Sequence, residues 1–90
     1  GHAASLFPNH ESIKNNSDNF IKVDNSPKPP KDRMSASRKL ISTAKHAVLI
    51  FFGEGKKDAY KKFADGKIGV KKCPTKIFNE IDDGIVLKDF

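Results

Sequence analysis

The longest uninterrupted apolar stretch lies near the middle of the chain, where residues 47–52 read Ala-Val-Leu-Ile-Phe-Phe before Gly53. The stretch shows no alternation of apolar and polar positions, which is typical of a strand buried on both faces. A buried helix segment is the alternative, although six residues closed by a glycine are short for a helix. Because helical patterns flank the stretch, we expect an α/β protein with this strand inside a mostly parallel sheet.

Shorter elements surround this strand. Ser37 is a suitable N-cap for a helix that continues to about residue 46. Residues 56–64 predict a second helix that Gly66 ends, with an apolar stripe of Ala59, Tyr60, Phe63 and Ala64. The other expected elements are a helical turn at 3–7, a surface loop or short exposed helix at 11–19, a strand at 20–23, a brief extended segment at 33–37, a basic loop at 67–72 and a last strand at 85–87.

A proline-rich connector interrupts the first half of the chain. Residues 26–30 read Ser-Pro-Lys-Pro-Pro, and prolines at this density exclude a helix and hold the backbone extended. Arg33 follows this stiff segment, so its guanidinium is a candidate for a fixed, bidentate grip on a phosphate. Lys28 lies on the connector and adds a point charge. The alternative is that both are solvated basic side chains beside a loop.

The charge of the chain favours an anionic partner. Seventeen Lys and Arg residues stand against 11 Asp and Glu residues, which gives a net charge of +6. The charge alone does not choose among nucleic acid, a membrane headgroup and a phosphorylated small molecule. The lysines at 56, 57, 61 and 62 are best interpreted as the solvated face of a helix. No aromatic residue lies among them on that face, as a single-strand nucleic-acid site requires.

Other compositional features narrow the class of protein. A single cysteine, Cys73, excludes an internal disulfide and a multi-cysteine zinc site. No apolar stretch approaches the roughly 18 residues that span a bilayer, and the sequence does not start like a signal peptide. We therefore expect a soluble, intracellular protein without metal or cofactor.

Three histidines are candidates for proton transfer. His2 lies between small residues that let water and substrate approach, and an imidazole takes a proton from water near neutral pH. A purely structural role, or a remnant of a purification tag, is the alternative for His2. His10 and His46 have no partner at ligand spacing. Gly53-Glu54-Gly55 stands where a phosphate loop would, but the glutamate between the glycines favours a tight turn.

Two motifs give the chain a family resemblance. Residues 1–8, Gly-His-Ala-Ala-Ser-Leu-Phe-Pro, resemble the Asp-Gly-His-Thr-Ala-Ser-Leu-Phe-Pro signature of the 6-phosphogluconolactonases. Residues 26–30 and Arg33 are similar to that family's next motif, Ser-Pro-Lys-Pro-Pro followed by an arginine. The related sugar-phosphate isomerases share the His element, but the Ala-Ser-Leu-Phe-Pro continuation and the proline-rich motif favour the lactonase.

The resemblance implies a hydrolase that opens 6-phosphoglucono-δ-lactone to 6-phosphogluconate in the oxidative pentose phosphate pathway, without metal or cofactor, in the cytoplasm. His2 would be the general base toward water, Arg33 would hold the substrate phosphate and Lys28 would help. Neither a membrane nor a nucleic acid is an expected partner of such an enzyme. The alternative is a non-catalytic basic module that binds nucleic acid or another polyanion.

The chain departs from the family pattern in ways that predict a fragment. Ala3 replaces the usual threonine, and the aspartate expected before Gly1 and the family's early glycine-rich phosphate loop lie outside the 90 residues. We therefore expect residues 1–90 to be the C-terminal part of one doubly wound domain with flanking helices, acting together with the missing N-terminal part. A third possibility is an inactive fragment that covers its apolar strand by self-association.

Overall fold

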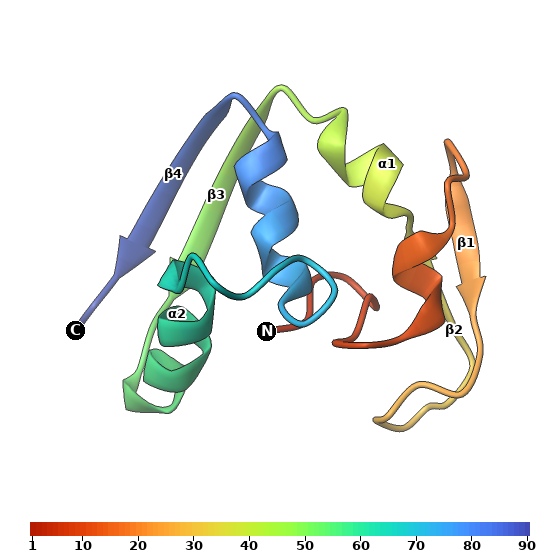
Figure 1. Ribbon diagram of the computed structural model, residues 1–90, viewed down its shortest axis with the longest axis horizontal. Helices are drawn as coiled ribbons and strands as arrows, with labels where there is room; N and C mark the ends of the chain where they lie inside the picture. The colour runs from red at the N-terminus through yellow and green to blue at the C-terminus, as the bar shows by residue number, and fades with distance from the viewer.

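Two small sheets stand at opposite sides of the molecule, with the N-terminal segment between them (Figure 1). The computed structural model describes residues 1–90 throughout. In chain order the elements are η1 (Glu11–Lys14), β1 (Phe20–Val23), β2 (Arg33–Ala36), α1 (Arg38–Ser42), β3 (His46–Phe51), η2 (Glu54–Lys56), α2 (Lys57–Ala64), η3 (Pro74–Glu80) and β4 (Asp83–Lys88), where η marks 3₁₀ helices. None of the helices has the length and apolar character needed to cross a membrane.

The fold is α/β, as predicted, but its strands form two separate pairs. β1 and β2 pair antiparallel, whereas β3 and β4 run side by side in the same direction (Figure 1). Only the second pair therefore has the parallel arrangement that the sequence predicts. A parallel pair needs a crossover between its strands, and η2, α2 and η3 supply it.

The hydrophobic core lies under the antiparallel pair. Its strand 20–23 is confirmed, and β2 confirms the extended segment at 33–37 apart from its last residue. The core cluster collects one or two side chains from each of four segments: Leu6, Ile13, Ile21, Val23 and Ile77. At about 1.5–3 kcal/mol for each large apolar side chain fully buried, this cluster holds the N-terminal segment against β1 and η3. Residues 11–19 contain the 3₁₀ helix η1, whose Ile13 is buried rather than exposed.

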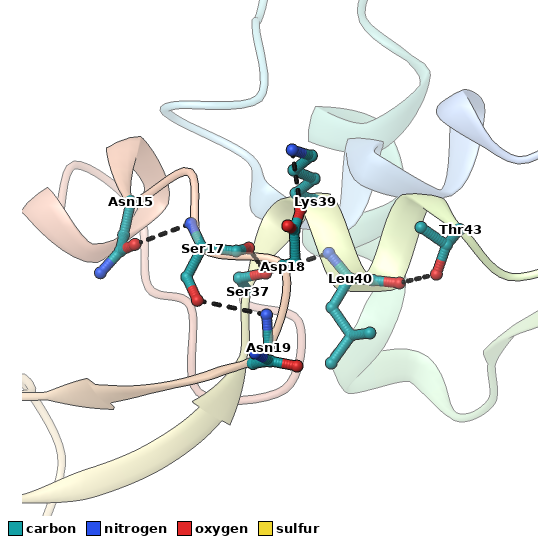
Figure 2. Close-up of polar contacts among 8 residues, drawn as sticks. All are labelled: Asn15, Ser17, Asp18, Asn19, Ser37, Lys39, Leu40 and Thr43. Carbon is teal, nitrogen blue, oxygen red and sulfur yellow. Dashed lines mark hydrogen bonds and ion pairs between the residues drawn. The ribbon is translucent and has the colours of Figure 1, made fainter.

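Ser37 begins α1 as predicted. Its hydroxyl accepts a hydrogen bond from the Leu40 amide at 3.0 Å and donates to the Ser17 carbonyl at 2.6 Å, so it also ties α1 to the preceding loop (Figure 2). The helix ends at Ser42, however, not near residue 46. The prediction was wrong because Thr43 closes the helix, with its hydroxyl on the Leu40 carbonyl at 2.6 Å, and His46 already pairs with β4.

One face of the β3–β4 pair is covered. Phe51 contacts Tyr60 and Phe63 of α2, with ring centroids 5.4 and 5.6 Å apart. These contacts confirm the apolar stripe predicted for the helix at 56–64. In the structure this helix is α2, and it ends at Ala64. On β4, Gly84 leaves room for the ring of Phe78 in η3, because a Cβ on Gly84 would lie 2.5 Å from that ring.

The opposite face is bare, so the prediction that residues 47–52 are buried on both faces is wrong within these 90 residues. Val48, Ile50 and Phe52 alternate with the covered residues and are 60, 53 and 57% exposed. On β4, Ile85 and Leu87 pair with Val48 and Ile50, so they share this face, and they are 56 and 43% exposed. The physical reason is that α2 and η3 cover one side only. We call these five residues the bare sheet face.

Candidate active site

The N-terminal segment makes a tight reversal that places His2 beside the core. Ala3 and Leu6 bridge each other through two backbone hydrogen bonds, of 3.2 and 2.8 Å, and Ala4 has a positive φ of 51°. The predicted helical turn at residues 3–7 is therefore wrong. The bridge forms because Leu6 is fully buried in the core, which pulls the segment into a hairpin-like turn.

The ring of Phe7 supports two side chains of the site, and we call it the platform. Its side chain is 2% exposed, and the exposed imidazole of His2 stacks on its ring with 4.9 Å between centroids and 23° between planes. The Arg33 guanidinium carbon lies 5.2 Å from the centroid of the same ring. Two residues that are 31 positions apart in the sequence therefore both lie against one buried aromatic ring.

The pKa of His2 lies below the ordinary value of 6.5. The first cause is partial burial of the ring, which disfavours the charged imidazolium. Positive charges nearby act in the same direction; they belong to Lys28, the amino group of Gly1, Arg33 and Lys56. A neutral imidazole at physiological pH has a free lone pair, as a general base requires.

Arg33 organises the proline-rich connector. Its Nε and Nη2 atoms donate hydrogen bonds to oxygens of residues 26–30: the Ser26 hydroxyl at 3.2 Å, and the carbonyls of Pro30 at 2.9 Å, Lys28 at 3.2 Å and Pro29 at 2.8 Å. Its Nη1 atom makes one long contact, 3.5 Å to the hydroxyl of Ser5. The guanidinium therefore orders its own loop through Nε and Nη2, and its Nη1 end makes only the long contact to Ser5.

Sequence reasoning missed one cation near His2. Lys56 was interpreted with its neighbours as a solvated helix face, yet its charge reaches the His2 imidazole. It precedes α2 in η2 and is exposed. The predicted residue Lys28 is also exposed, and among the nearby charges it contributes most to lowering the pKa of His2. The only signal for Lys56 in the sequence is its position just after the turn that follows the apolar strand.

The remaining candidates are occupied elsewhere. The ring of His10 contacts the Ser12 hydroxyl at 2.9 Å and the Asp24 carbonyl at 2.7 Å, and His46 pairs with Asp83 at 2.6 Å. The amide of Gly53 donates to the carboxylate of Asp89 at 2.9 Å, so the turn at Gly53 is closed by the chain itself. Cys73 is free and fully buried. No three His, Cys, Asp or Glu side chains gather as metal ligands do.

The principal cavities of the surface lie away from His2. The largest, of about 640 Å³, lies between η1 and β1, and another, of about 400 Å³, lies between η1, α1 and η3. His2 and Arg33 line neither of these cavities nor two others, of about 440 and 270 Å³. Within these residues the site is thus an open surface with an imidazole, an aromatic floor and a rim of cations.

Fold and site together define an α/β protein that presents a neutral histidine beside an anion-attracting surface. The sequence model of one family, described as glucosamine-6-phosphate isomerases/6-phosphogluconolactonase, matches residues 1–86. The chain belongs to this family. The resemblance drawn from residues 1–8 and 26–33 is confirmed.

Curated relatives agree with this assignment. The chain is 33% identical over 87 residues to a 6-phosphogluconolactonase of Borreliella burgdorferi, and the matched region covers 97% of this chain and 37% of the relative. It is 32% identical over 81 residues to a probable chloroplastic 6-phosphogluconolactonase 3 of Oryza sativa subsp. indica, covering 89% of this chain and 25% of the relative. Over 58 residues it is 40% identical to a probable 6-phosphogluconolactonase of Schizosaccharomyces pombe, covering 64% of this chain and 23% of the relative. The chain thus spans between about a quarter and a little over a third of these relatives.

Proposed function

We propose that this chain supplies the base and the phosphate-binding side of a 6-phosphogluconolactonase active site. The reaction is hydrolysis of 6-phosphoglucono-δ-lactone to 6-phosphogluconate in the oxidative pentose phosphate pathway. Family membership and the names of the relatives support this activity. The observation that carries it is that His2 and Arg33 both lie against the ring of Phe7. The alternative of a nucleic-acid module has no support from the relatives.

His2 is the general base in this proposal. Its neutral imidazole takes a proton from a water molecule, whose oxygen then attacks the lactone carbonyl carbon. As the bond between that carbon and the ring oxygen breaks, the imidazolium returns the proton to the departing oxygen, which becomes a hydroxyl. The lowered pKa of His2 supports the first step, because most of the imidazole is neutral at pH 7.

The cations near His2 hold the phosphate end of the substrate. Arg33 contributes its Nη1 end, since its Nε and Nη2 atoms are engaged by the connector. Lys28 and Lys56 add positive charge close to the imidazole. Fixing the phosphate at one end places the carbonyl at a repeatable distance from the base, which lowers the entropic part of the barrier.

The rest of the domain completes the site. We place residues 1–90 as the C-terminal part of a doubly wound, mostly parallel sheet whose N-terminal part covers the bare sheet face and the open side of His2, in a cytoplasmic enzyme. Two observations support this: the bare sheet face is apolar and exposed, and the relatives extend well beyond the matched region. An exposed apolar face of this kind is typical of a surface that another element covers.

The test compares two substrates in the complete domain, with the N-terminal part supplied in the same chain or as a separate polypeptide. We expect hydrolysis of the phosphorylated lactone, and Arg33→Ala should raise KM about tenfold or more for it while leaving KM for unphosphorylated glucono-δ-lactone nearly unchanged. Arg38→Ala is the matched control, since Arg38 pairs with Glu80 outside the site. Equal effects of Arg33→Ala on both lactones would refute the phosphate assignment, and no hydrolysis of either would refute the function.

A further inference from the structure

Thr75 holds the backbone of His2 from a distant part of the chain. Its amide donates to the Gly1 carbonyl at 3.1 Å, and the single proton of its hydroxyl is shared between the same carbonyl at 2.9 Å and the His2 carbonyl at 3.3 Å. Thr75 is 8% exposed, so these bonds form largely away from competing water. The His2 backbone is thus tied directly to η3, an element 73 positions away.

The start of η3 explains why Thr75 is available for this contact. The first amides of a helix have no partner within the helix, and Pro74, which opens η3, has no amide hydrogen. The Thr75 amide is therefore the first free donor of η3. Its neighbour Cys73 packs so closely that a Cβ on Gly1 would lie 3.2 Å from its sulfur, so the two segments sit in tight contact.

His2 is held on three sides. Thr75 binds the carbonyls at and before it, the bridge between Ala3 and Leu6 fixes the residues after it, and Phe7 supports its ring. The bridge and Phe7 belong to the same short segment as His2. Beside the core packing of Leu6 and Ile77, Thr75 is the polar contact that ties this segment to η3, and through η3 to Phe78 and the β3–β4 pair.

We infer that Thr75 is a positioning residue for His2, whose hydroxyl sets where the imidazole stands relative to the bound substrate. This inference rests on the proposed function for its effect on the reaction. Its structural part, that the Thr75 hydroxyl fixes the placement of the His2 ring, does not depend on the reaction. Because Thr75 hydrogen-bonds Gly1 and His2 and makes no hydrogen bond to Arg33 or Lys28, losing the hydroxyl should lower kcat and leave KM nearly unchanged.

The experiment compares Thr75→Val, which keeps the shape and the amide but removes the hydroxyl, with Thr75→Ser, which keeps the hydroxyl. Both are made in the complete domain. We expect Thr75→Val to lower kcat about tenfold with KM within about twofold of wild type, and Thr75→Ser to retain kcat within about twofold. Thr43→Val is the matched control: its hydroxyl bonds only the Leu40 carbonyl at the end of α1, and kcat should not change.

A second readout separates this inference from the proposed function. The His2 imidazole is titrated by NMR in each protein; in Thr75→Val its pKa should move up toward 6.5, because a loosened ring is less buried. If no lactone is hydrolysed, this titration alone decides: a shift in Thr75→Val that is absent in Thr75→Ser supports the positioning role. An unchanged titration, or wild-type kcat in Thr75→Val, overturns it. Should Thr75→Val not fold, Thr75→Ala carries the same expectations.

Discussion

The imidazole of His2 lies almost flat on the ring of Phe7, with 23° between the two planes. Because Phe7 is 2% exposed, its ring is fixed by the core and the imidazole inherits that orientation. The same ring carries the guanidinium of Arg33. The relative position of His2 and Arg33 therefore depends on the buried side chain of Phe7.

Replacing that platform should damage both functions at once. Phe7→Leu keeps an apolar side chain but removes the flat ring, so we expect kcat to fall about tenfold and KM for the phosphorylated lactone to rise several-fold. Phe20→Leu is the matched control, since Phe20 is 64% exposed on β1, and it should leave both constants unchanged. Steady-state kinetics measures the effect. Wild-type kinetics in Phe7→Leu would show that the stack does not position the two residues.

The pH dependence of the reaction should report the lowered pKa of His2. The base must be neutral, so kcat/KM should be constant at neutral pH and fall as the pH drops through a midpoint below 6.5. Lys56→Ala removes a positive charge near the ring, so it should move this midpoint to higher pH. Lys61→Ala, on the outer face of α2, serves as control and should leave the midpoint in place. A midpoint above 6.5 in the wild type contradicts the assignment.

A second acid-sensitive feature concerns stability rather than catalysis. Partial burial of Glu80 acts to raise its pKa, but hydrogen bonds from Arg38 and Ser42 and the charge of Arg38 outweigh it, so the pKa lies below 4.5. The resulting stabilisation is present above pH 4.5 and is lost as the pH falls through the lowered pKa.

Glu80→Gln should therefore reduce the free energy of unfolding by about 1 kcal/mol at pH 7, a modest figure because both partners are partly exposed. The difference from wild type should shrink as the pH falls below 4.5. Glu54→Gln is the control, since the Glu54 side chain is 83% exposed in its pair with Lys57, and should cost under about 0.5 kcal/mol. Urea unfolding at several pH values measures both, and a pH-independent loss in Glu80→Gln is the contrary result.

Substitutions on the bare sheet face test whether the N-terminal part of the domain covers it. In these 90 residues Val48 and Met34 are similarly open, at 60 and 75% exposed, so a lysine at either position costs little here. In the complete domain, Val48→Lys should destabilise by about 3 kcal/mol or more, because it would bury an unpaired charge, while Met34→Lys should stay within about 0.5 kcal/mol. Equal small effects of the two substitutions in the complete domain would mean that nothing covers the sheet.

Local patterns in the sequence predicted the parts of the fold that depend on local chemistry. The unbroken apolar character of residues 47–52 identified β3, the hydroxyl of Ser37 identified the start of α1, and the spacing of Tyr60 and Phe63 identified the covered face of α2. The predictions for the end of α1 and for residues 3–7 are wrong because contacts distant in the sequence decide both. Pairing of His46 with β4 ends the helical region, and burial of Leu6 in the core shapes the N-terminal turn.

The site was predicted only in part for the same reason. Motif resemblance pointed to His2, Arg33 and Lys28, and in the structure the charges of Lys28 and Arg33 contribute to lowering the pKa of His2. The motifs did not reveal that Arg33 donates most of its hydrogen bonds to its own loop, or that Thr75 hydrogen-bonds the His2 backbone. Both contacts join segments that no periodicity or spacing relates, so only tertiary structure exposes them.

The most direct measurement is kcat for 6-phosphoglucono-δ-lactone in His2→Ala, made in the complete domain beside His46→Ala. His46 is an exposed histidine that pairs with Asp83 at the start of the β3–β4 sheet, so its loss controls for removing an imidazole. Loss of the general base should lower kcat by about 10²–10⁴-fold in His2→Ala, with little change in KM, and His46→Ala should match the wild type. A His2→Ala protein that folds and retains wild-type kcat would contradict the role of His2 as the base.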